Sequence, residues 1–96
     1  MKLMNAHIKI QFYAMFKEIV GKKEIIHDIY SETTLGEVLT MLAKKYGKDF
    51  EETIDKKTGQ VDVNTLVMLN GQNIRDTDVK LKENDLIIIT IPVGGG

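Results

Sequence analysis

The side chains that could carry out chemistry are few in this sequence of 96 residues. It has no cysteine, which excludes thiolate nucleophiles, thiolate zinc sites and disulfides together. Two histidines, His7 and His27, and one serine, Ser31, do not supply the nucleophile, base and orienting group of a catalytic triad. A metal site shared by the histidines would lack further ligands at suitable spacing. We therefore expect an exposed His7, a partly covered His27 and no resident metal.

The charged residues are close to balance, with 13 Lys and Arg against 14 Asp and Glu. A net charge of -1 gives no overall field to attract nucleic acid or anionic lipid, and Arg75 is the single arginine available for base readout. Carboxylates gather in 51–55 and 76–78, but no apolar surroundings are evident that would shift their pKa values. We expect solvated charges there, and neither nucleic-acid nor membrane binding.

The end of the sequence has the one feature that folding does not require. Gly94-Gly95-Gly96 follows Pro92-Val93 directly. Glycines lose much conformational freedom on ordering and have no side chain to pack. They can pass through a narrow channel in another protein and leave a terminal carboxylate accessible, which a partner could activate as a mixed anhydride with AMP. The alternative is a frayed terminus or an expression scar.

The first half of the sequence predicts two strands followed by a helix. Residues 6–12 alternate polar and apolar, which is typical of a strand with one buried face, and 24–30 is β-branched and aromatic. Between them, 14–21 favours a short helical turn that ends at a glycine. Thr34 and Glu37 have the spacing of a capping box. The predicted helix continues with a single apolar stripe to Gly47, which can take the left-handed conformation.

The second half predicts the rest of a sheet. Residues 48–62 are polar and indicate a loop with a helical turn. A strand over 65–69 ends in the tight-turn pair Asn70-Gly71, 72–74 returns as a short edge strand, and the Ile-rich 86–93 is expected at the sheet's centre. This order predicts an α+β β-grasp fold, a mixed sheet of four or five strands with one main helix across one face. We assign 1–93 to the domain and 94–96 to a flexible tail.

Strand parity also predicts an exposed apolar patch. Ile8, Ile10 and Phe12 define the core face of the first strand, and Ile87, Ile89 and Ile91 are the expected core set of the last. The residues that alternate with these core positions then face away from the helix. In the third and last strands these residues are apolar, namely Leu66, Met68, Leu86 and Ile88. Such a patch beside the tail suits docking to a partner. The alternative is that 48–62 folds over this face.

Taken together, these segments resemble the MoaD/ThiS family of β-grasp sulfur carriers and ubiquitin-like modifiers, closest to the small subunit of molybdopterin synthase. The resemblance spans nearly the whole chain and includes 67–71, 81–85 and, most specifically, the terminal Pro-Val-Gly-Gly-Gly. Gly94 stands where the family often has Ala or Ser, and Ile91 where a second Pro is common. Neither difference blocks the chemistry.

The resemblance implies a carrier that is not itself an enzyme. Gly96 would be adenylated by a ubiquitin-activating-like adenylyltransferase that uses ATP and magnesium, and then converted to a thiocarboxylate. Gly95 completes the required pair, and Pro92, Val93 and Gly94 form the extended lead-in. The thiocarboxylate would donate sulfur to a pterin precursor within the molybdopterin synthase large subunit.

Two further uses remain open. The same tail serves modifiers that join to protein lysines, and a β-grasp interaction module would not need the tail.

The alternation in residues 1–16 excludes a signal peptide or a membrane span at that position, so we expect a cytoplasmic protein.

Overall fold

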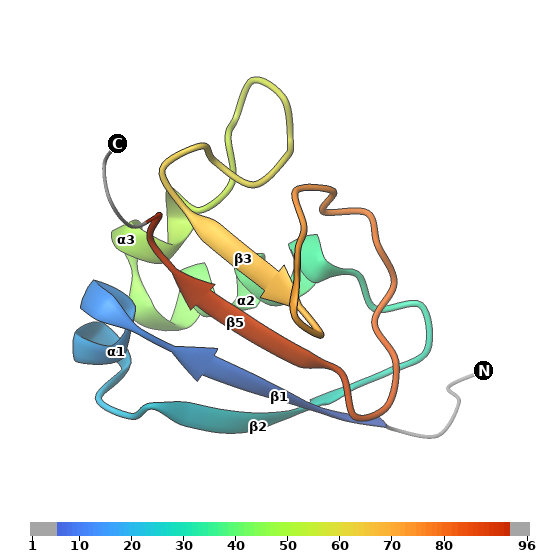
Figure 1. The fold of residues 1–96 in the computed structure, drawn as a ribbon. Coiled ribbons are helices and arrows are strands. Elements are labelled where there is room, and N and C mark those ends of the chain that lie inside the picture. The colour runs from blue at the N-terminus through green and yellow to red at the C-terminus, as the bar shows by residue number, and fades with distance from the viewer. Residues whose placement is uncertain (1–5, 93–96) are drawn as a thin grey trace.

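A five-stranded mixed sheet with helices packed on one side forms the body of the protein (Figure 1). The computed structural model describes residues 6–92. Along the chain the elements are β1 (Ala6–Phe12), α1 (Ala14–Val20), β2 (Glu24–Ile29), α2 (Leu35–Tyr46), α3 (Lys48–Glu51), β3 (Leu66–Leu69), β4 (Gln72–Asn73) and β5 (Leu86–Thr90). The strand order is β2-β1-β5-β3-β4, so the last strand lies at the centre as predicted. The β-grasp prediction is confirmed.

The register of the strands explains where the core lies. β1 pairs antiparallel with β2 and parallel with β5, which places Ile10 opposite Ile87 and Phe12 opposite Ile89. Cross-strand partners point to the same face of a sheet. The predicted alternation therefore puts Ile8, Ile10 and Phe12 beside Ile87 and Ile89 under the helices, where all five are buried.

The main helix, α2, covers this inner face of the sheet and begins where the capping box was predicted. The Thr34 side chain accepts a hydrogen bond from Glu37 N, and the Glu37 side chain accepts one from Thr34 N. The buried side chains of α2 form one stripe, which consists of Leu35, Val38, Leu39 and Leu42. Gly47 ends the helix at φ 101° and ψ -157°, outside the predicted left-handed helical region, because the chain turns directly into α3.

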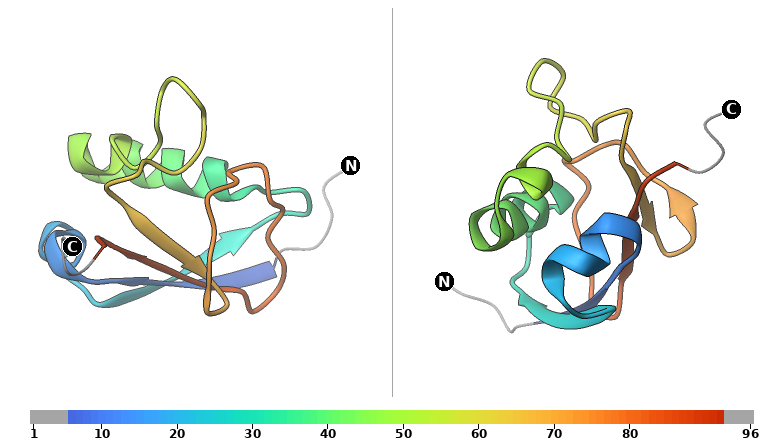
Figure 2. Two further views of the ribbon diagram at one scale, coloured as in Figure 1. Left: turned by 45° about the horizontal axis from the view of Figure 1, so that its top comes forward. Right: turned by 90° about the vertical axis from the view of Figure 1, so that its left-hand side faces the viewer.

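The stretch 48–62 contains the expected helical turn, α3, and lies on the helix side of the sheet (Figure 2). Phe50 anchors it, with its ring 5.8 Å from Phe12 and 5.0 Å from Phe16 between centroids. Further along, Thr77 Oγ1 donates a 2.6 Å hydrogen bond to Gly59 O. The alternative in which this stretch covers the outer face of the sheet is therefore wrong, because Phe50 and Val61 are buried in the inner core.

The last strand is shorter than the sequence predicted. β5 ends at Thr90, the residue opposite Leu66 at the start of β3. Ile91 therefore extends past its partner strand and is 39% exposed, so its assignment to the core was wrong. The edge strand β4 similarly ends at Asn73 rather than Ile74. Within residues 6–92, no helix is long and apolar enough to cross a membrane.

Candidate functional site

The outer face of the sheet, opposite the helices, brings together the four apolar residues predicted to form a patch. Met68 lies directly opposite Ile88, Leu66 lies opposite Thr90, and Leu86 is next to Lys9. We call Leu66, Met68, Leu86 and Ile88 the outer patch. Each member is half-buried rather than fully exposed, because side chains of the neighbouring strands flank it. The outer patch is thus a shallow apolar strip across β3 and β5.

A polar border on β1 and β2 flanks the outer patch. Gln11 lies beside Ile88 and donates a 3.0 Å hydrogen bond from Nε2 to Glu24 Oε1. Lys9 Nζ lies 3.8 Å from Glu24 Oε2. The Tyr13 hydroxyl donates to Gln11 Oε1 at 3.3 Å. An apolar centre with a paired polar border is the general anatomy of a protein-binding surface.

The chain leaves the sheet at the end where β1 passes into α1. Tyr13 N donates a 3.1 Å hydrogen bond to Ile89 O, which holds Tyr13 against the end of β5. Tyr13 is 36% exposed and Met15 43%, and Ile91 and Pro92, which follow β5, are also exposed. The remaining predicted tail residues, Val93, Gly94, Gly95 and Gly96, lie outside the described residues.

Sequence reasoning missed Tyr13 and Met15 as surface apolar residues. The sequence did indicate an exposed Tyr13, because this residue continues the alternating series of outward-facing residues His7, Lys9 and Gln11. Met15 gave no comparable signal, because its short helix could have turned either side to solvent.

The two histidines are not brought together. His7 lies on the outer face, exposed as expected, with Nδ1 2.5 Å from Asp28 Oδ1. His27 is half-buried on the inner face, opposite Ile8. Across residues 6–92 no group of three or more His, Cys, Asp or Glu side chains could hold a metal ion. At another exposed pair, the hydrogen bond and negative charge of Glu32 raise the pKa of Lys80 above 10.5.

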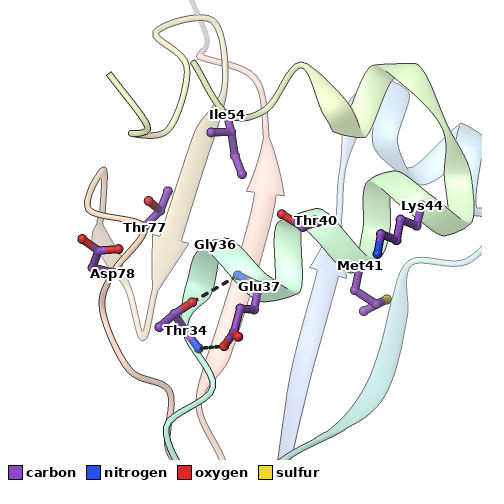
Figure 3. A pocket seen from close by; sticks show the side chains of 9 residues that line it. All are labelled: Thr34, Gly36, Glu37, Thr40, Met41, Lys44, Ile54, Thr77 and Asp78. Carbon is purple, nitrogen blue, oxygen red and sulfur yellow. Dashed lines mark hydrogen bonds between the residues drawn. The ribbon is translucent and has the colours of Figure 1, made fainter. Parts of the chain in front are cut away.

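A hollow of about 500 Å³ lies at the start of α2 (Figure 3). The backbone N–H groups at the helix start are already used within the chain, because Thr34 N and Glu37 N take part in the capping box. Leu35 N donates to Val79 O at 2.9 Å, and Gly36 N donates to Thr77 O at 2.8 Å. Four N–H groups that could have bound an anion are thus satisfied. The lining of this hollow provides no nucleophile activated by a base.

A small mixed sheet crossed by one main helix, with the last strand at its centre, defines a ubiquitin-like β-grasp protein. The chain belongs to the ThiS family, whose model matches residues 10–96. This confirms the resemblance found in the sequence.

Two relatives cover almost the whole chain. Small archaeal modifier protein 3 of Haloferax volcanii is 29% identical over 92 residues, which are 93% of this chain and 98% of the relative. The molybdopterin synthase sulfur carrier subunit of Dictyostelium discoideum is 30% identical over 94 residues, which are 97% of this chain and 100% of the relative. The solution structure of the HVO 2177 protein of Haloferax volcanii is 28% identical. It has a TM-score of 0.80, with coverage of 96% of this chain and 88% of that chain.

These likenesses place the chain in the ubiquitin-like sulfur carrier and modifier family. Members of the family are small carrier or modifier proteins that are generally non-catalytic. This agrees with the shortage of catalytic side chains in the sequence.

Proposed function

We propose that the Gly96 carboxylate is the working group of this protein and that the protein is a sulfur carrier for molybdenum or tungsten cofactor synthesis. A partner adenylyltransferase of the ubiquitin-activating type, with ATP and magnesium, joins the carboxylate to AMP and releases pyrophosphate. A sulfur donor then displaces AMP and leaves a thiocarboxylate. The molybdopterin synthase large subunit is the proposed site at which that sulfur passes to a pterin.

The observation that carries this proposal is the course of the chain at the end of β5. The central strand of the sheet continues into the exposed Ile91 and Pro92, and the sequence beyond them is Val93 and three glycines. The relationship to a sulfur carrier subunit of molybdopterin synthase supports this choice of pathway. The body of the protein supplies no reacting group of its own in this scheme.

The outer patch and Pro92–Gly95 are the proposed recognition elements for these partners. Leu66, Met68, Leu86 and Ile88 offer apolar area on the outer face of the sheet, and Tyr13 and Ile91 are further exposed apolar residues near the ends of β1 and β5. A methionine within such a strip can adapt to more than one partner surface, since its side chain is unbranched.

The intact mass of the protein tests the carrier chemistry. The purified chain is incubated with a cognate activating enzyme, ATP, magnesium and a sulfur donor. The expected product is heavier by the exchange of one oxygen for one sulfur, and omission of ATP serves as the control. An unchanged mass with an enzyme that activates a known carrier contradicts the proposal.

A second candidate function is that of a protein modifier, which is favoured by the relationship to a small archaeal modifier protein. The activated Gly96 would then form an amide bond with lysines of target proteins. Enrichment of the tagged chain from cells, followed by mapping of lysine adducts, distinguishes this function. Adducts that require Gly96 favour the modifier, and transfer of sulfur in a mixture with the large subunit favours the carrier.

A further inference from the structure

The free edge of β2 is unused by the sheet and is available for pairing. β2 is the outermost strand on its side of the sheet (Figure 1). Phe12 N donates a 2.8 Å hydrogen bond to Lys23 O. This bond determines which of the residue pairs between β1 and β2 are hydrogen-bonded to each other. Because bonded and non-bonded pairs alternate in an antiparallel ladder, the backbone N–H and C=O groups of Glu24, Ile26 and Asp28 point away from β1.

A groove runs along this edge between β2 and α2. Two hollows lie in it, of about 430 Å³ and about 390 Å³, and both include His27 in their lining. Ile25, Met41 and Tyr46 are among the residues that line the first hollow, and Val38 is among those that line the second. We call this feature the edge groove. It offers open backbone groups along one side and two depressions of mixed polar and apolar lining beneath them.

The side chain of Ile26 lies at the same edge, on the outer face of the sheet. It is 60% exposed, although it lies in the middle of a strand. Exposed aliphatic residues on a free edge favour association with another strand, so proteins usually avoid them. The flanking carboxylates are engaged with β1, since Glu24 bonds to Gln11 and Asp28 to His7. Ile26 is therefore the side chain on this part of β2 that remains available for contact with another molecule.

The charges at one end of the edge groove indicate what it would accept. Lys22 and Lys45 both line the hollow near Glu24. Among the ion pairs formed within residues 6–92, neither lysine has a carboxylate partner. Lys45 Nζ instead lies 5.5 Å from the centroid of the Tyr46 ring. Two ammonium groups without acidic partners at the end of the groove complement an acidic side chain.

We propose that the edge groove binds an extended peptide segment of another protein by β-strand addition. The segment pairs its backbone with Glu24, Ile26 and Asp28 and places alternate aliphatic side chains in the two hollows. Acidic residues at one end of the segment lie beside Lys22 and Lys45. Main-chain hydrogen bonds supply affinity in this mode of recognition, and the hollows and charges supply specificity. The site is separate from the outer patch, which lies across β3 and β5.

Two blocked heptapeptides serve as probes, since the added strand can run in either direction. Val-Thr-Ile-Thr-Val-Asp-Asp presents its acidic end to Lys22 and Lys45 when it pairs antiparallel, and Asp-Asp-Val-Thr-Ile-Thr-Val does so when it pairs parallel. Titration is followed by the amide NMR signals of the protein. One probe is expected to shift the amides of Glu24, Ile26 and Asp28, and its version with Lys in place of Asp is expected to bind about tenfold more weakly.

The variants Ile26→Pro and Ile26→Thr form a matched pair. Proline removes an N–H that points to the free edge, so the β1–β2 ladder keeps its hydrogen bonds and the domain folds. Threonine keeps the N–H while removing the same aliphatic side chain. We expect Ile26→Pro to abolish probe binding and Ile26→Thr to retain most of it. The double variant Lys22→Glu/Lys45→Glu, at exposed positions, is expected to weaken binding about tenfold or more.

Three results would overturn the proposal. The first is equal binding by Ile26→Pro and Ile26→Thr. The second is a set of shifts centred on Met68 and Ile88, which would assign the probe to the outer patch. The third is a dimer of the unliganded protein that Ile26→Pro dissociates, which would assign the edge to a second copy of this chain. Because no probe touches Gly96, failure of this proposal leaves the sulfur carrier function untouched, and the reverse holds too.

Discussion

Asn70 and Asp85 join two segments that are distant in sequence. Asn70 Nδ2 donates to Asp85 Oδ1 at 2.8 Å, while Asn70 Oδ1 accepts from Leu86 N at 2.8 Å. Asp85 Oδ2 accepts from Lys82 N at 2.8 Å, and only 9% of Asp85 is exposed. The turn after β3 and the loop before β5 are therefore one bonded unit. The sequence predicted both turns from residue type, but it carried no local signal that they bond to each other.

The variant Asn70→Ala is expected to lower the free energy of unfolding by about 2 kcal/mol, because it leaves Oδ1 of the largely buried Asp85 and the N–H of Leu86 without their side-chain partner. The positive φ of Asn70, 53°, adds to the loss, since alanine adopts that region less readily. Urea denaturation measures the change. Asn73→Ala, at an exposed position on β4, is the control and is expected to change stability little. Equal losses in the two variants would show that the bonded unit contributes nothing.

The start of α2 is the element that the sequence predicted most completely. The Thr34-x-x-Glu37 pattern is local, so neighbouring residues alone determine its geometry. The ends of strands are different. The Ile-rich run indicated a strand to Val93, yet pairing stops at Thr90 because β3 begins at its partner, Leu66. Strand length thus depends on a partner distant in sequence, which no local pattern specifies.

Replacing Thr34 by alanine is expected to cost about 1 kcal/mol of stability, because Glu37 N loses its side-chain acceptor at the helix start. Thermal or urea unfolding measures the loss. Thr40→Ala in the exposed middle of the same helix is the matched control, and it is expected to be neutral or slightly stabilising since alanine favours helix. If Thr34→Ala proves as stable as the wild type, backbone bonds to the loop 77–79 hold the helix start alone.

The sheet's outer face gives a second prediction at this scale. Met68→Asp is expected to weaken binding of a molybdopterin synthase large subunit or an activating enzyme at least tenfold, because a charge would replace the centre of the outer patch. Asn73→Asp is the matched control, since Asn73 is the cross-strand neighbour of Met68. Calorimetric titration compares the two variants. Unfolding of Met68→Asp, detected by circular dichroism, would mean that this half-buried side chain belongs to the folding core.

At the scale of the whole molecule, the sequence predicted the order of elements better than the surfaces. Alternation along β1 and β5 assigned the two faces of the sheet, whereas the reactive tail indicated by the glycines lies outside the described residues and stays a prediction. The edge groove could not be predicted, because it forms between β2 and α2 through their relative placement. The position of 48–62 was open for the same reason, since Phe50 could have packed against either face.

Removal of Gly95 and Gly96 separates the folding of the domain from the chemistry proposed for the end of the chain. The shortened chain is expected to keep its melting temperature, because glycines contribute no side-chain packing to the core. It is expected to lose adenylation entirely, since the new terminus ends two residues short of the partner's reacting centre. Differential scanning calorimetry and ATP–pyrophosphate exchange measure the two properties. Thr40→Ala, at an exposed position on α2, is the control variant and is expected to keep adenylation. A large fall in melting temperature would show that the end of the chain stabilises the domain, and retained exchange would remove Gly96 from the chemistry.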